Sequence, residues 1–99
     1  MVLLVSEARE TRLWKVAGVV QGVGFRWFVS RNARALGVDG WVQNMTSGEV
    51  LVHARGAPDV LRQLHQIILE GPPHARVERI DDLDVEPPSP PAAPFSILG

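Results

Sequence analysis

Two stretches with helical spacing enclose a pair of strand-like stretches, and this order restricts the fold more than any other feature of the chain. In residues 25–36 and again in 58–70, apolar side chains recur every three or four positions, as in an amphipathic helix with one buried face. Residues 38–45 and 49–55 between them are strand-like and are joined by a short turn at 46–48, as in a β-hairpin. The pattern therefore predicts two helices separated by a hairpin.

Further strands are predicted on both sides of this unit. Residues 13–20 combine Trp with β-branched valines, residues 76–85 place acids between apolar side chains, and residues 95–98 form a last short stretch. Gly37 ends the first predicted helix, and Gly71, followed by two prolines, ends the second. The order β-α-β-β-α-β predicts an α+β, ferredoxin-like sandwich. In it, two helices cover one face of an antiparallel sheet, to which a short C-terminal edge strand is added.

The length of the chain fits one domain. At 99 residues it is too short for two ordinary domains, and we expect residues 1–10 to form an N-terminal extension and 11–99 the folded domain. The apolar run at 2–5 is followed directly by charged side chains and is too short for a secretion signal or a membrane span. We therefore expect a cytoplasmic protein that does not bind membranes.

The composition excludes several classes of site. The chain has no cysteine, which rules out a disulfide scaffold, a Cys-ligated zinc site and catalysis by a thiolate. Its histidines, His53, His65 and His74, do not have the spacing of metal ligands, so we expect no metal site. The formal net charge of −1 argues against a dedicated nucleic-acid binder, because such domains are usually strongly basic.

Positive charge gathers in one part of the chain. Residues 9–34 contain six Lys and Arg side chains and a single acid, Glu10. A solvated basic surface accounts for this distribution, and so does a basic end of the molecule that attracts a small anion. Charge alone leaves both interpretations open.

The predicted topology brings two motifs to one edge of the sheet. A right-handed crossover makes the first and second strands parallel with the third between them, so residues 21–26 and 44–48 are expected to be neighbours. In 21–26 (QGVGFR) two glycines allow backbone amides to turn inward around an anion, and the helix dipole adds positive potential. Arg26 stands in the first helical turn with no acid to offset it, and its guanidinium suits two phosphoryl oxygens. A plain glycine turn beside a solvated arginine is the alternative.

Asn44 ends the second predicted strand at this same edge. Asparagine is unfavourable inside strands, and its amide both donates and accepts hydrogen bonds, which suits it to hold a water or a phosphoryl oxygen. The alternative is that Asn44 simply begins the hairpin turn. The loop has neither the Lys-Ser/Thr ending of a nucleotide P-loop nor the downstream acid of a dinucleotide fold.

Together these motifs resemble the two signatures of the acylphosphatase family. The matching segments are VQGVGFR at 20–26, GWVQN at 40–44, GEV at 48–50, the family's Gly-Pro segment at 71–73 and its Phe-x-Ile segment at 95–97. The resemblance covers residues 11–98, which is nearly the whole chain.

The resemblance implies a hydrolase that cleaves the carboxyl–phosphate bond of small acyl phosphates to a carboxylate and inorganic phosphate. It assigns phosphoryl binding to Arg26 and the loop before it, and orientation of the attacking water to Asn44. The loop residues are Gln21, Gly22, Val23, Gly24 and Phe25. No cofactor and no metal are implied. We further expect inhibition by the product inorganic phosphate, no nucleic-acid partner, and a monomer.

Two other interpretations were weighed against this one. Residues 24–29 (GFRWFV) have some likeness to the aromatic motif of RNA-recognition domains. That motif belongs on the third strand, which here carries no aromatics. A homologue can also bind acyl phosphates without turning them over. The presence of both Arg26 and Asn44 favours an enzyme, since a binder needs only the loop and the arginine.

Overall fold

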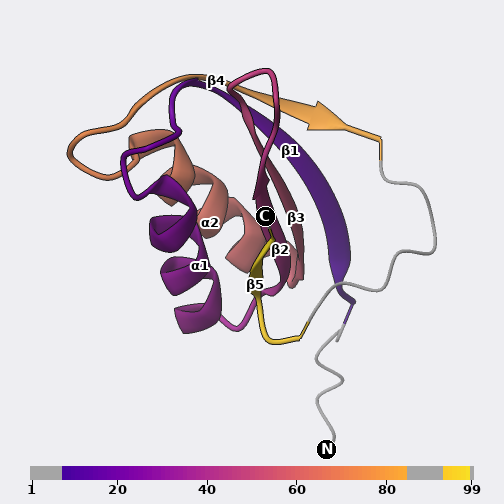
Figure 1. The fold of residues 1–99 in the computed structure, drawn as a ribbon. Helices are drawn as coiled ribbons and strands as arrows, with labels where there is room; N and C mark the ends of the chain where they lie inside the picture. The colour runs from indigo at the N-terminus through magenta and orange to yellow at the C-terminus, as the bar shows by residue number, and fades with distance from the viewer. Residues whose placement is uncertain (1–7, 85–92, 99) are drawn as a thin grey trace, which may run out of the picture.

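A computed structural model describes residues 8–84 and 93–98 of the chain (Figure 1). In chain order the elements are β1 (Glu10–Val19), α1 (Phe25–Ala35), β2 (Asp39–Asn44), β3 (Val50–Gly56), α2 (Pro58–Glu70), β4 (Arg76–Leu83) and β5 (Ser96–Leu98). Every predicted segment overlaps an observed element of the predicted type. The α+β, ferredoxin-like fold class is therefore confirmed.

The strands form one five-stranded sheet in the order β4-β1-β3-β2-β5. β3 pairs antiparallel with both β1 and β2, so β1 and β2 run in the same direction, as the crossover argument requires. β4 pairs antiparallel with the other side of β1. The edge strand β5 pairs with β2 in parallel, which makes the sheet mixed where an antiparallel one was predicted. A three-residue strand carries no pattern that fixes its direction.

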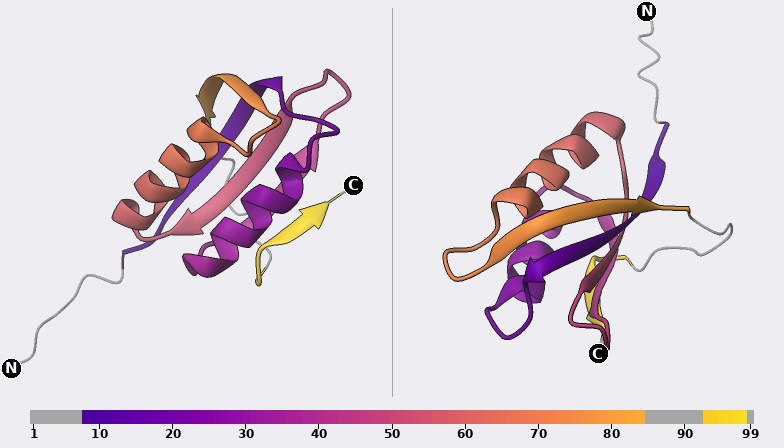
Figure 2. Two further views of the ribbon diagram at one scale, coloured as in Figure 1. Left: turned by 90° about the vertical axis from the view of Figure 1, so that its left-hand side faces the viewer. Right: turned by 90° about the horizontal axis from the view of Figure 1, so that it is seen from above.

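Both helices lie on the same face of the sheet, as the two further views show (Figure 2). The largest fully buried side chains of the core between the layers are less than 2% exposed. They are Val16, Val20, Phe25, Val29, Val38, Val42, Val50, Val52, Leu64, Ile68 and Phe95. α1 has 11 residues and α2 has 13, and no helix in the described part of the chain could span a membrane.

The bounds of two strands differ slightly from the prediction. β1 begins at Glu10, so this strand takes in the last residue of the predicted extension 1–10; residues 1–7 lie outside the described part. β4 ends at Leu83, before the predicted end at 85. In each case backbone pairing to a neighbouring strand, and not the apolar pattern of the sequence, decides the last residue.

His53 is buried on the sheet face that points away from the helices. It lies in β3 between Val52 and Ala54, both of which are core residues, and successive strand residues point to opposite faces. Its ring stacks on Trp41 with centroids 5.2 Å apart. Within the described residues neither ring nitrogen has a hydrogen-bond partner. Burial consequently lowers the pKa of His53 below its usual value, because the charged form loses hydration.

This burial predicts a loss of stability in mild acid. Below about pH 6.5, His53 takes up a proton in the unfolded chain but stays neutral in the folded protein until a lower pH is reached. The free energy of unfolding therefore falls by up to about 1.4 kcal/mol for each pH unit. When the pH is lowered from about 8 to about 5.5, we expect the free energy of unfolding, measured in urea, to fall more for the wild type than for His53→Phe. His74→Gln, at an exposed position, is the control. Equal pH dependence in wild type and His53→Phe would contradict the assignment.

Candidate active site

The turn between β1 and α1 has the backbone of an anion-binding loop. Gly22 and Gly24 both adopt left-handed conformations, with φ of 75° and 76°, whereas no non-glycine residue in the described ranges does so. Val23 between them therefore has an ordinary φ, and alternation of this kind turns successive amides toward one side. A Cβ placed on either glycine would meet no atom within 4 Å. The backbone conformation, and not a lack of space, is what requires glycine here.

The first turn of α1 adds to the positive potential of this loop. Gly24 caps the helix without a side-chain hydrogen bond, and the first turn contains no acid. The first intrahelical bond runs from the Phe28 amide to the Gly24 carbonyl at 3.0 Å, so the amides before Phe28 have no acceptor within the helix. A pocket of about 180 Å³ opens here, lined in part by Gly22, Gly24 and Arg26. Of the predicted site residues, Gly22, Gly24, Phe25 and Arg26 line this pocket, whereas Gln21, Val23 and Asn44 do not.

The side chain of Gln21 connects this loop to the hairpin between β2 and β3. Its Nε2 donates to the carbonyl oxygens of Met45 and Glu49, both at 2.8 Å. Those two residues close the hairpin, since the Met45 amide donates to the Glu49 carbonyl at 2.8 Å. Because Met45 directly follows Asn44, the contact holds the loop beside the end of β2. The expected proximity of 21–26 and 44–48 is confirmed.

Asn44 is the last residue of β2 and pairs with Val50 of β3. Its side-chain Oδ1 is buried and has no hydrogen-bond donor within the described residues. A buried acceptor without a donor is unfavourable by roughly 1–3 kcal/mol. Such an atom is commonly satisfied by a bound water. This oxygen can therefore accept a hydrogen bond from a bound water.

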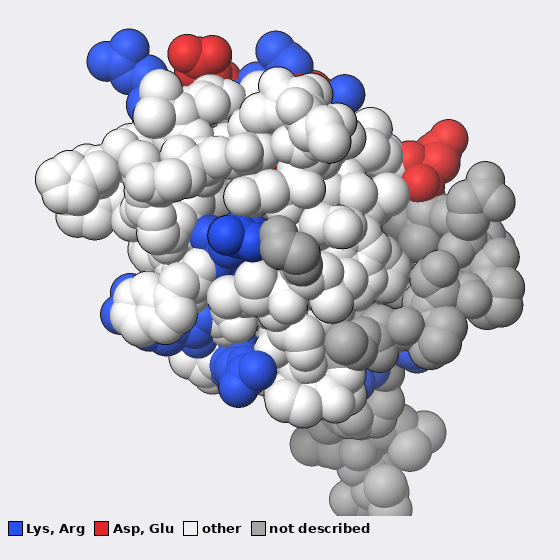
Figure 3. Space-filling model, viewed as in Figure 1, with Lys and Arg blue, Asp and Glu red and all other residues white. Residues whose placement is uncertain are grey.

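The cations of residues 9–34 fall into two groups. The three before the loop each lie within 4.0 Å of a carboxylate: Arg9 with Asp39, Arg12 with Glu10 and Lys15 with Glu49. The other three are the arginines of α1, a helix that contains no acid. In the described part of the chain neither Arg31 nor Arg34 forms an ion pair. Figure 3 shows Lys and Arg at the centre and lower left of the face in view and again along its upper edge, where Asp and Glu also lie.

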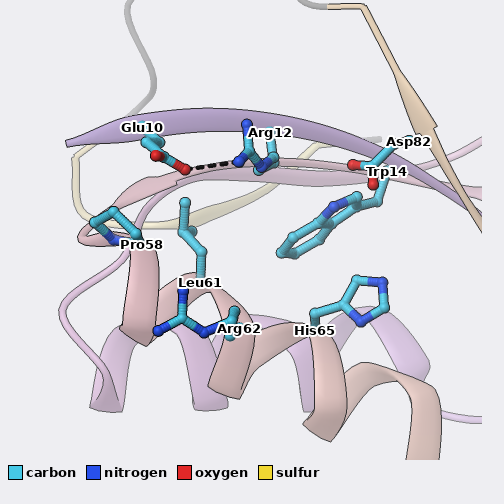
Figure 4. A pocket seen from close by; sticks show the side chains of 8 residues that line it. All are labelled: Glu10, Arg12, Trp14, Pro58, Leu61, Arg62, His65 and Asp82. Carbon is cyan, nitrogen blue, oxygen red and sulfur yellow. Dashed lines mark hydrogen bonds and ion pairs between the residues drawn. The ribbon is translucent and has the colours of Figure 1, made fainter.

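A second pocket, of about 300 Å³, lies near the start of β1, between that strand and α2 (Figure 4). The rings of Trp14 and His65 meet edge to face in it, with centroids 5.3 Å apart. Glu10 and Arg12 form an ion pair of 2.7 Å at its rim, and Asp82 adds a further carboxylate. Arg12 and Arg62 balance these two carboxylates, so the lining has no net positive charge to attract a phosphoryl group. The loop after β1 therefore remains the candidate site.

Comparison with known proteins agrees with this geometry. The sequence model of the acylphosphatase family matches residues 14–97. The chain belongs to the acylphosphatase family. The acylphosphatase of Koribacter versatilis is 45% identical to it over 85 residues, which are 86% of this chain and 74% of that protein.

Solved structures of acylphosphatases have the same fold. That of Bacillus subtilis matches with a TM-score of 0.82 at 31% identity, covering 90% of this chain and 98% of the other. HypF of T. kodakarensis matches with a TM-score of 0.73 at 28% identity, covering 91% of this chain but 12% of its own. The predicted family and class of enzyme are confirmed: acylphosphatases hydrolyse acyl phosphates.

Two features of the acylphosphatase site were missed by the sequence analysis. The Gln21 side chain, expected to contribute only its backbone amide, fastens the loop to the hairpin. Trp27 and Ile97 line the loop pocket but were not expected there. Ile97 belongs to the Phe-x-Ile segment noted above, but no local pattern indicates that it reaches the pocket, because it comes from β5 at the far end of the described chain. In the ranges 8–84 and 93–98, no group of three or more His, Cys, Asp or Glu could hold a metal ion.

The Gln21 contact predicts that Gln21→Glu loosens the site. The substitution keeps the shape of the side chain but places a carboxylate oxygen against two carbonyl oxygens in place of a donor. We expect a loss of about 2 kcal/mol in the free energy of unfolding, measured in urea, from two hydrogen bonds of about 1 kcal/mol each. The exposed Gln43→Glu on β2 is the matched control. Equal stability of the two variants would show that the contact does not support the fold.

Proposed function

We propose that the loop after β1, Arg26 and Asn44 carry out direct attack of a water on the phosphoryl group of a small acyl phosphate. The observation that carries this proposal is the buried Asn44 Oδ1 without a donor in the described residues, at the sheet edge to which Gln21 fastens the loop. An acceptor for water thus belongs to the same sheet edge as a loop whose backbone suits an anion. Hydrolysis of an acyl phosphate needs both.

The phosphoryl group is bound by the backbone amides of residues 21–25 and by the Arg26 guanidinium. The left-handed conformations of Gly22 and Gly24 and the uncapped first turn of α1 support this, because both turn amides toward an anion. Arg26 adds a fork of N–H donors that matches two phosphoryl oxygens. As charge spreads over these oxygens in the transition state, fixed donors stabilise it without reorganising.

Asn44 orients the water. Its Oδ1 accepts one hydrogen bond from the water, which turns an oxygen lone pair toward phosphorus. The new P–O bond forms as the bond between phosphorus and the acyl oxygen breaks, and the electron pair of the broken bond leaves on the carboxylate. Both protons of the water end on the phosphate product. A carboxylate is a weak base that leaves unprotonated, so the step needs no general acid, and Asn44 acts by position alone.

Three finer features belong to the same proposal. The reaction proceeds without cofactor or metal, since water, donors and leaving group supply all the chemistry described above. The protein acts as a monomer, because the proposed site is built from one chain. It works in the cytoplasm, where we expect small acyl phosphates to be available.

The first test is hydrolysis of benzoyl phosphate in the presence of a chelator. We expect Arg26→Gln to lower kcat/KM by about 100-fold, as for loss of a charge-stabilising donor. Asn44→Ala should lower kcat by about 100-fold with little change in KM, because the water is held mainly in the transition state. Gln43→Ala, the exposed neighbour on β2, serves as the control. Full activity of Asn44→Ala would refute the water-orienting role, and phosphate binding without turnover by the wild type would identify a binder.

The second test is inhibition by inorganic phosphate. Phosphate shares the phosphoryl oxygens of the substrate, so it should compete with benzoyl phosphate for the amides and Arg26. We expect competitive inhibition whose constant rises about tenfold in Arg26→Gln, equivalent to one charged hydrogen bond. Sulfate, of similar shape, is a comparison ligand. Inhibition that leaves KM unchanged would place the phosphate outside the proposed site.

A further inference from the structure

Trp27 is the most exposed of the large apolar side chains in the described ranges, at 60%. It lines the loop pocket and also an adjoining pocket of about 450 Å³, formed by Trp27, Ser30, Arg31, Arg34 and Ile97. Trp27 and Ile97 belong to both pockets. A ligand held at the loop by its phosphoryl group therefore has a direct path into this adjoining pocket.

The adjoining pocket follows one face of α1. Residues 27, 30, 31 and 34 are spaced three, four and seven positions apart, which puts them in one row along a helix. The row starts beside the loop, because α1 begins at Phe25. Its opposite wall is Ile97 of β5, which is 43% exposed. The pocket thus leads away from the phosphoryl site between an aromatic ring and an aliphatic side chain.

The charge of this row is positive, and no carboxylate of the described residues forms an ion pair with Arg31 or Arg34. The Arg31 guanidinium carbon lies 4.5 Å from the centroid of the Trp27 ring, a contact that orders the arginine without using a carboxylate. Arg34 donates from Nε to the Phe95 carbonyl at 2.8 Å, which fixes its position. Neither arginine has an ion pair within the described residues. An ordered, unpaired guanidinium beside an aromatic ring suits a planar or apolar group that ends in an anion.

We infer that this pocket binds the acyl part of the substrate, and that the preferred substrates are acyl phosphates with a second anionic group at the end remote from the phosphoryl group. The inference rests on the proposed function of the loop. From Arg26 to Arg31 the helix rises by roughly 7.5 Å, about the length of a short dicarboxylic acid phosphorylated at one end. The body of the acyl group lies against Trp27 and Ile97, and its distal carboxylate meets Arg31. Arg31 is thus a specificity-determining residue.

The test compares two chromogenic substrates of the same shape. One is para-carboxybenzoyl phosphate, which carries a distal anion, and the other is para-carbamoylbenzoyl phosphate, in which a neutral amide replaces it. The readout is the ratio of their kcat/KM values. For the wild type we expect a ratio of about ten in favour of the anion, as for one exposed charged hydrogen bond. Arg31→Gln should bring the ratio to about one, and Arg31→Glu should bring it below one.

Arg62→Gln on α2 is the matched control, because Arg62 is likewise an exposed helical arginine but lines the pocket at the start of β1. It should keep the wild-type ratio, which separates a local effect of Arg31 from a change in net charge. Equal hydrolysis of both substrates by the wild type, or an unchanged ratio in Arg31→Gln and Arg31→Glu, would overturn this inference and leave the proposed function standing. Hydrolysis of neither substrate would overturn the proposed function and this inference with it.

Discussion

The carboxamide of Gln21 makes the contact on which the candidate site depends. Its two hydrogen bonds, to the Met45 and Glu49 carbonyls, join segments that are more than twenty residues apart in sequence. The sheet brings these segments to one edge, because β3 lies antiparallel between β1 and β2. Strand pairing alone does not fix the conformation of the connecting loops. The Gln21 contact fixes the anion-binding turn relative to Asn44. In the mechanism proposed above, this contact sets the distance between phosphorus and the attacking water.

The charges near this edge of the sheet are distributed in a way that the net charge of the chain does not indicate. The formal net charge of the chain is −1. The cations that precede the loop form ion pairs with Asp39, Glu10 and Glu49. The arginines of α1 share a helix with no acid, and the dipole of that helix adds to their potential near the loop. The basic stretch therefore divides into three cations that are ion-paired with carboxylates and three arginines on a helix that itself contributes no acid.

Sequence patterns predicted the elements well where burial is periodic. α1 and α2 were predicted from apolar spacing, and the residues that define it, such as Phe25, Val29 and Leu64, are buried in the core. The parallel direction of β5 could not be predicted, since a strand of three residues has no directional pattern. The burial of Asn44 Oδ1 and of His53 could not be predicted from the sequence either. In both cases the burial comes from neighbouring segments and not from the residue's own strand.

By itself the sequence determined the order of strands and helices, the glycines that permit a left-handed turn at 22 and 24, and the residue types available at the site. These depend on local periodicity and backbone sterics, which act within a few residues. Tertiary structure alone decided that Gln21 fastens the loop, that Asn44 keeps a buried acceptor, and that Ile97 faces Trp27 across a pocket. Each of these joins residues far apart in the chain, and only the packing of helices on a sheet brings them within contact distance.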